Sequence, residues 1–148
     1  MTGELVGCPG AGRPEAQLIH FLIDNHERLK RTVETIPDGV RTRTLSADPE
    51  IIDAVRTHVR QMADLIHTGG SIRTWDPLFR EVFDHREAIE IEITDIEGGV
   101  EVIETAEDDY VAELIRAHAA KVEDFVARGL AAYREETPLP EGYSDTRP

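Results

Sequence analysis

The chain has 148 residues, of which 30 are acidic and 16 are basic, so its formal net charge is −14. This length suits one domain with a full hydrophobic core, and the scarcity of basic residues disfavours a nucleic-acid partner, whose phosphates require a positive surface. Cys8 is the only cysteine, which excludes an internal disulfide and any cysteine-based zinc or iron–sulfur site.

The acidic composition has two interpretations. Only two of the basic residues are lysines, and an acidic, lysine-poor surface is typical of a protein from a high-salt habitat, where screening reduces self-repulsion. An ordinary acidic bacterial protein from a GC-rich genome is the other interpretation. No apolar run approaches the length of a transmembrane helix, so no membrane partner is expected.

Residues 1–13 are predicted to form a flexible, glycine-rich leader. The segment Leu5-Val6-Gly7-Cys8 resembles the cleavage box of a bacterial lipoprotein. Only four residues precede it, which leaves no room for the charged and apolar segments of a signal peptide. We therefore expect a cytoplasmic protein, and an exported or lipid-anchored one only if Met1 is not the native start.

The first half of the chain predicts a helix, a hairpin and a second helix. Apolar residues recur at helical spacing over residues 15–32. Residues 33–44 predict two short strands that turn at Pro37-Asp38-Gly39. A second helix is expected to begin after Asp48, which is followed by proline, and to end at the glycine pair after His67.

The second half repeats these signals. Trp75-Asp76-Pro77-Leu78-Phe79 predicts the start of a short helix, and the alternation of isoleucine with polar residues over 89–94 predicts a half-buried strand. A return strand follows the turn at residues 97–99, and a last helix is expected from Asp108 or Asp109 to about Gly129. The tail over residues 135–148 is expected to be loosely ordered.

An internal repeat organises these elements. Residues 18–69 align with residues 78–129 at a constant offset of sixty, and eleven of the 52 aligned pairs are identical. Each copy is predicted to be an αββα unit. Because a lone hairpin is unstable in water, we expect the two hairpins to form one four-stranded antiparallel sheet covered on one face by helices. The predicted fold is α+β, with one pseudo-twofold domain over residues 14–134.

Two histidines stand at matching positions of the repeat and are the leading candidates for a site. Arg56-Thr57-His58 aligns with Arg116-Ala117-His118, and both histidines lie on the apolar stripe of their helices. Facing neutral imidazoles suit copper, zinc or haem iron. Met62, one turn beyond His58, would favour a soft ion, and His20 is a candidate third ligand. We therefore predict a non-enzymatic protein that binds a transition-metal ion or haem.

Two alternatives stay open. The histidines could be core residues, hydrogen-bonded together with Arg56 and Arg116, in an interaction or regulatory module that is monomeric or homodimeric. Such a module should have a closed interior and no pocket. The second alternative is an enzyme that acts on a small molecule in a cleft at the pseudo-twofold axis.

The sequence singles out no catalytic residue. None of the common phosphate-binding, nucleophile or metalloprotease motifs occurs. Glu90, Glu92 and Glu101 are expected on the solvated face of the sheet, where Arg41 and Arg43 would form cross-strand ion pairs that contribute little when exposed.

Several segments carry a resemblance to a protein family. The stretches RTHVRQM, IRTWDPLF and LIRAHAAKVEDFVARG, with the turns PDGV and EGGV, resemble a family of small uncharacterised prokaryotic proteins. The resemblance covers roughly His20 to Gly129. It implies that the positions of His20, His58, Met62, Asp76-Pro77 and His118 belong to the family pattern, and it implies no activity.

Overall fold

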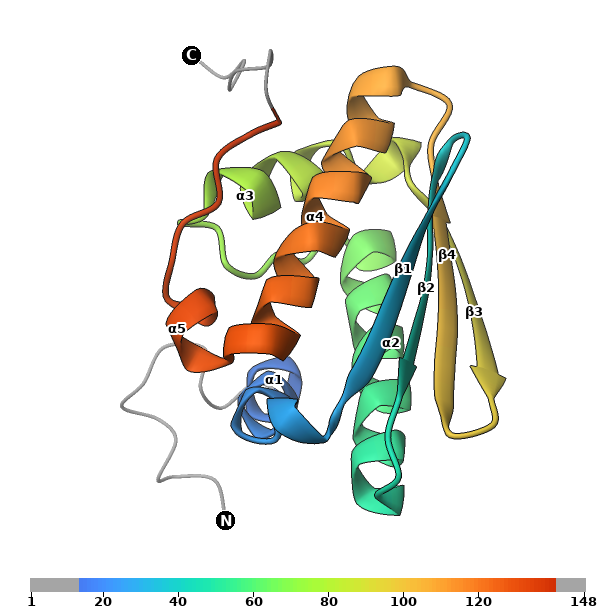
Figure 1. Ribbon diagram of the computed structural model, residues 1–148. Helices are drawn as coiled ribbons and strands as arrows, with labels where there is room; N and C mark the ends of the chain where they lie inside the picture. Colours follow the sequence, from blue (N-terminus) through green and yellow to red (C-terminus); the bar gives the residue numbers. More distant parts are fainter. Residues whose placement is uncertain (1–13, 141–148) are drawn as a thin grey trace.

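The computed structural model describes residues 14–140, so the expected leader and residues 141–148 lie outside the described part of the chain. The fold is α+β. A four-stranded antiparallel sheet has the strand order β1-β2-β4-β3, and Figure 1 shows the helices together on one side of it. Within the described residues, no helix combines the length and the apolar character that crossing a membrane requires. The elements are α1 (Pro14–Asp24), η2 (His26–Arg28), β1 (Lys30–Ile36), β2 (Gly39–Leu45), α2 (Pro49–Thr68), α3 (Pro77–Asp84), η3 (Arg86–Ala88), β3 (Glu90–Ile96), β4 (Gly99–Thr105), α4 (Asp109–Arg128) and α5 (Leu130–Tyr133).

The first helix is shorter than the sequence predicts. The apolar spacing indicated a helix over residues 15–32, but α1 ends at Asp24 and β1 already begins at Lys30. Asn25 ends the helix, because its side-chain amide donates a hydrogen bond to the carbonyl oxygen of Phe21 and satisfies an acceptor of the last turn. The β-branched residues that follow favour extended backbone.

The other helix boundaries follow the predicted caps. The carboxylates of Asp48, Asp76 and Asp108 each accept a hydrogen bond from a backbone N–H in the first turn of α2, α3 and α4. Helix α2 ends at Gly69, whose φ of 89° is the left-handed conformation that glycine adopts without strain. Helix α4 ends at Gly129 and continues into the short α5.

The register of the sheet decides which side chains face the helices. Thr42 of β2 lies opposite Val102 of β4, at the centre of the seam between the two hairpins. Because side chains alternate along a strand, Thr42 and Thr44 share the inner face with Val102 and Glu104. Arg43 and Glu101 share the outer face, where the Arg43 Nε lies 2.8 Å from a carboxylate oxygen of Glu101, as the sequence predicted.

Each long helix covers the hairpin of the other half of the chain. Helix α2 packs mainly on β4 and β3, whereas α4 packs mainly on β2 and β1. Accordingly, Val100 of β4 is buried with Ile51 and Val55 of α2, and Val40 of β2 is buried with Ile115 of α4. The order helix, 3₁₀ turn, hairpin and long helix therefore occurs twice, but neither occurrence encloses its own core. The duplication itself stays a prediction.

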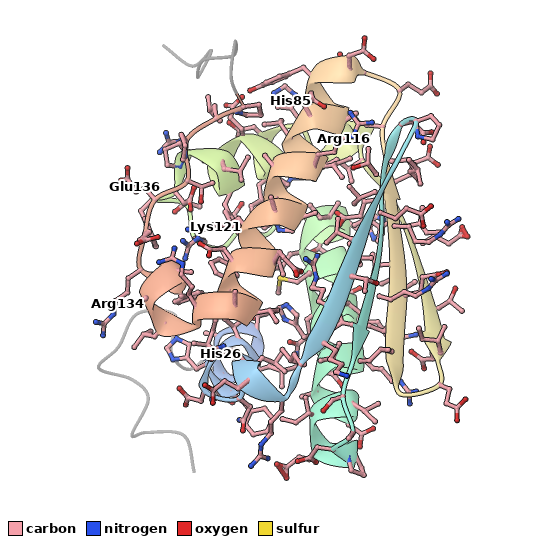
Figure 2. The ribbon with its side chains drawn as sticks, in the orientation of Figure 1. His26, His85, Arg116, Lys121, Arg134 and Glu136 are labelled. Carbon is pink, nitrogen blue, oxygen red and sulfur yellow. The ribbon has the colours of Figure 1, made fainter. Side chains whose placement is uncertain are left out.

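Two arginines hold each long helix on the hairpin of the other half of the chain. Arg56 of α2 donates hydrogen bonds to the carbonyl oxygens of Ile96 and Gly99 at the turn between β3 and β4. Arg116 of α4 donates to the carbonyl oxygens of residues 36, 37 and 39 at the turn between β1 and β2, and Figure 2 shows it beside that turn. These arginines therefore bind the hairpin turns and are not hydrogen-bonded to His58 or His118.

Residues 135–140 are held against the domain, although we expected the tail from residue 135 to be loosely ordered. The Thr137 hydroxyl donates a hydrogen bond of 2.8 Å to the carboxylate of Asp76, and the backbone N–H of Thr137 also points to this carboxylate. Leu139 packs on the hydrophobic cluster formed by α3 and α4. Asp76, which caps α3 and has no exposed surface, therefore also anchors the chain after α5.

Candidate functional site

A cavity of about 210 Å³ lies between the inner face of the sheet and the helices. Its walls come from all four strands, from α1 to α5 and from the segment before α3, and most of the lining side chains are apolar. The interaction-module alternative expected a closed interior, whereas the described residues enclose a cavity. Nine polar or ionisable side chains also line it: His26, Arg31, Thr42, Thr44, His58, Arg73, Glu104, His118 and Tyr133.

His58 and His118 both point into this cavity, as their position on the apolar stripes predicted. They lie deep between the layers, and the surface that they still expose faces the cavity. Burial lowers the pKa of each imidazole to about 4, and the pKa of His118 is lowered further by the charges that Arg31 and His58 can carry. Both rings are therefore neutral at pH 7, so each offers one hydrogen-bond donor and one acceptor.

The environments of the two imidazoles differ. The Nδ1 atom of His58 is buried and has no hydrogen-bond partner among the described residues. The His118 ring packs edge-on against Phe79, with the ring centroids 5.0 Å apart. A purely structural histidine is usually hydrogen-bonded to a backbone carbonyl group or another partner in the protein. Within the described residues, neither of these rings has a hydrogen bond to a backbone carbonyl group. Both rings are available to a ligand.

The structure brings some of the other predicted residues to the cavity and leaves one outside. Met62 lines the cavity one turn beyond His58. His20 does not line it, because it is exposed on α1 and its ring packs edge-on against Tyr133 with centroids 6.0 Å apart. His26 does line it, and its Nδ1 is 2.7 Å from the carbonyl oxygen of Val126.

Glu104 is a cavity residue that sequence reasoning missed. It lies on the inner face of β4, directly opposite Val40 of β2 and Ile91 of β3. Burial raises its pKa to about 7, and the positive charge of Arg31 lowers that pKa by a smaller amount. Among the described residues, its carboxylate has no hydrogen bond and no ion pair. An uncompensated carboxylate in such a place is costly, so it requires an explanation.

The alternation of inward and outward side chains along β4 could have identified Glu104. In β4 the inward positions are 100, 102 and 104, and the first two are valines. Because the next residue on the same face is two positions further along, Glu104 follows from the same alternation. The apolar neighbour Ile103 suggests instead that position 104 belongs to the solvated face. Arg31 was missed for another reason, since it was assigned to the end of the first helix.

Arg31 brings a positive charge to the same cavity from the edge strand β1. Its side chain is only 7% exposed, and it donates a hydrogen bond of 2.9 Å to the carbonyl oxygen of Ala119 on α4. It also lies 3.3 Å from a carboxylate oxygen of Glu123. Burial lowers the pKa of Arg31, but an arginine stays charged at neutral pH.

Arg73 closes the cavity beside α5. Its guanidinium carbon lies 4.3 Å to 5.0 Å from the ring centroids of four aromatic residues: Trp75, Phe79, Phe125 and Tyr133. Its Nε donates to the buried carboxylate of Asp76, and its two terminal nitrogens donate to the carbonyl oxygens of Tyr133 and Glu135. Each of the three nitrogens of Arg73 therefore donates a hydrogen bond within the protein, and the charge of Arg73 is paired with Asp76.

The cavity thus combines an apolar wall with neutral imidazoles, a carboxylate and a guanidinium. Among the described residues, no three histidine, cysteine, aspartate or glutamate side chains gather closely enough to hold a metal ion. A metal held by His58 and His118 would therefore need Met62 or a ligand from solution to complete its coordination.

Comparison of the chain with known protein families, with curated proteins and with solved structures found no match.

Proposed function

We propose that the protein binds a small, mostly apolar organic molecule in the cavity between its sheet and its helices. The observation that carries this proposal is the combination of an apolar cavity with polar side chains, those of His58 and Glu104, that have no hydrogen-bond partner among the described residues. Ligand pockets have this composition, with a few placed polar groups in an apolar wall. Unpartnered polar groups in a protein interior are rare and call for a specific reason.

The volume of the cavity limits the size of the ligand. A cavity of about 150 Å³ in another protein holds benzene, so 210 Å³ accommodates roughly eight non-hydrogen atoms by proportion. This is the size of a small aromatic or alicyclic compound that carries one functional group.

The polar groups specify what that functional group should be. Neutral His58 and His118 can each donate one hydrogen bond, and Arg31 can donate from the nitrogens that α4 does not occupy. Glu104 would repel an anionic ligand whenever it is ionised. We therefore expect a neutral ligand with a carbonyl or hydroxyl oxygen, such as cyclohexanone or phenol, to bind better than benzoate.

The proposal is tested by measuring how far a ligand stabilises the wild-type protein and two variants whose substitutions lie side by side on β4. Binding to the native state raises the melting temperature, so toluene, phenol, cyclohexanone and benzoate should be compared in melting experiments. Val102→Phe fills the cavity from the inner face of β4, whereas Ile103→Phe adds the same ring to the outer face. We expect Ile103→Phe to respond to ligand like the wild-type protein and Val102→Phe to lose the response. Equal shifts in both variants, or no shift in the wild type, would contradict the proposal.

A transition-metal ion is the second candidate ligand for the same residues. Two neutral imidazoles that line one cavity, an unpartnered Nδ1 on His58 and the thioether of Met62 one turn along the same helix favour a soft ion such as Cu(I), with Zn²⁺ as the alternative. Haem is several times larger than the cavity and would force the helices away from the sheet.

Elemental analysis tests this second candidate. Protein purified without a histidine tag from medium containing copper and zinc should carry close to one equivalent of metal, and His58→Leu and His118→Leu should each remove it. His67→Leu, at an exposed position of the same helix, is the matched control. A metal content that is the same in all four proteins would exclude this role for the paired histidines.

A further inference from the structure

Glu104 is the charged residue among the inward positions of β4, although its neighbours would suit an apolar side chain. The side chains directly beside it on β2 and β3 are Val40 and Ile91, and α2 and α4 cover this face. Thr44, sixty residues earlier in the chain, also lines the cavity but carries no charge. A carboxylate at position 104 therefore does not follow from packing or from the repeat.

Among the described residues, no cation forms an ion pair with this carboxylate. Arg31 is the nearest cation that affects it, but its guanidinium is hydrogen-bonded to Ala119 and paired with Glu123 on α4. Arg73, at the α5 end of the cavity, uses its three nitrogens for Asp76 and for two carbonyl groups. Within the described residues Glu104 thus faces the cavity unpaired, and its raised pKa of about 7 leaves it divided between its two protonation states at neutral pH.

Two groups on the helices that line the same cavity as Glu104 can assist it without competing for its proton. His58 on α2 and His118 on α4 have pKa values near 4, so they do not take up a proton at pH 7. As neutral imidazoles they can donate a hydrogen bond to an oxygen of a ligand. A base with a pKa close to the working pH, in the same cavity as donors that can stabilise a developing negative charge, is the combination that proton abstraction beside a carbonyl group requires.

We propose that Glu104 is a general base that removes a proton from the carbon next to the carbonyl group of a small ketone or aldehyde held in the cavity. In this step the C–H bond breaks and the proton moves to a carboxylate oxygen of Glu104. The electron pair of that bond forms a double bond to the carbonyl carbon, and the π electrons of the carbonyl group move to its oxygen, which accepts a hydrogen bond from His58 or His118. Return of a proton to the same carbon exchanges its hydrogen, and return to another position gives an isomer, so no oxidant or cofactor is consumed. This inference rests on the proposed function, because the ligand must first occupy the cavity.

Hydrogen exchange in cyclohexanone tests the inference directly. The ketone has seven non-hydrogen atoms, which is within the roughly eight that the cavity accommodates, and its exchange with D₂O near neutral pD is slow without a catalyst. We expect the wild-type protein to accelerate loss of the α-hydrogen signals in a saturable manner. The rate should rise with pD and level off above about 7, following ionisation of Glu104.

Two variants of one strand provide the controls. Glu104→Gln keeps the shape of the side chain but cannot accept the proton, and we expect it to lower the catalysed exchange by about 100-fold. Glu101→Gln changes a carboxylate on the outer face of β4 and should exchange cyclohexanone at the wild-type rate. Circular dichroism checks that both variants are folded.

The outcomes separate this inference from the proposed function. If the wild-type protein does not accelerate exchange, or if Glu104→Gln exchanges as fast as Glu101→Gln, Glu104 is not the base. If cyclohexanone nevertheless raises the melting temperature and Val102→Phe abolishes that shift, the cavity still binds ligands and only the inference fails. If none of the ligands stabilises the protein, the proposed function fails as well.

Discussion

Arg31 and Glu104 have no charged counterparts in the other half of the chain. At an offset of sixty residues, Ile91 matches Arg31 and Thr44 matches Glu104, whereas His58 matches His118 and Arg56 matches Arg116. The residues that hold the fold together, such as the arginines at the hairpin turns, are thus alike in the two halves. The unmatched Arg31 and Glu104 line the cavity, as do their counterparts Ile91 and Thr44. This contrast indicates that a ligand would meet different chemistry on its two sides.

The largest effect is expected from separating the two halves. Because α2 covers the β3–β4 hairpin and α4 covers the β1–β2 hairpin, residues 1–71 or residues 72–148 alone would leave their hairpins uncovered. We expect each fragment to be unfolded by circular dichroism and the equimolar mixture to regain secondary structure. A cooperative melting transition in an isolated fragment would show that each half encloses a core of its own.

Acid stability should reveal the two buried histidines. In the unfolded chain the imidazoles take up protons below pH 6.5, but in the folded protein only below about pH 4. Stability is therefore lost as the pH falls from 6.5 to 4, by up to about 3 kcal/mol for each ring at 1.36 kcal/mol per pKa unit. Urea unfolding at pH 7 and pH 4.5 should show a smaller loss in His58→Leu and in His118→Leu than in the wild type. His67→Leu should behave like the wild type, and a similar acid loss in all four proteins would mean that the rings are protonated in the folded state.

Glu104, which has no charged counterpart in the other half of the chain, should make the stability depend on pH in the opposite direction. Its pKa is raised from 4.5 to about 7, so the folded protein keeps a proton that the unfolded chain releases. Stability therefore declines as the pH rises from 4.5 to 7, by about 3 kcal/mol. Glu104→Thr, which copies the residue at position 44, should remove this decline in urea unfolding between pH 5 and pH 8. An unchanged decline would assign it to another group.

The two turn-binding arginines should contribute similar, smaller amounts. Arg56→Ala and Arg116→Ala each remove hydrogen bonds from a charged donor to hairpin carbonyl groups, and we expect each to lower the free energy of unfolding by about 1–2 kcal/mol. Arg43→Ala removes an exposed ion pair and should lower it by less than about 1 kcal/mol. Chemical denaturation measures all three. A large difference between the losses of unfolding free energy in Arg56→Ala and Arg116→Ala would show that the two arginines do not contribute equally.

Local signals in the sequence predicted most of the fold. The aspartate caps, the glycines that end the long helices and the alternation of β3 act within a few residues, so they could be identified without the structure. The boundary between α1 and β1 was wrong, because Leu29 and Val33 happen to continue a helical spacing beyond Asn25. Which hairpin each long helix covers depends on contacts such as those of Arg56 and Arg116, which join residues 40 and 80 positions apart in the sequence, and no local pattern specifies them.

The candidate site was predicted in part. The inward direction of His58 and His118 follows from the helical period, and both line the cavity. The cavity itself was not predictable, because it results from how the helices are spaced above the sheet. Glu104 could have been recognised from strand alternation alone, but its lack of a partner depends on where Arg31 is held by α4.

The exchange of helices between the halves also has a consequence during synthesis. The β1–β2 hairpin leaves the ribosome well before α4, since Leu45 precedes Arg128 by more than eighty residues. At a synthesis rate of about 5–20 residues per second, several seconds pass before α4 can cover the inner face of that hairpin. Val40, Thr42 and Arg31 are thus presented to water, or to a chaperone, before the layer that buries them has been translated. In nascent chains this face therefore stays uncovered until the end of α4 has emerged.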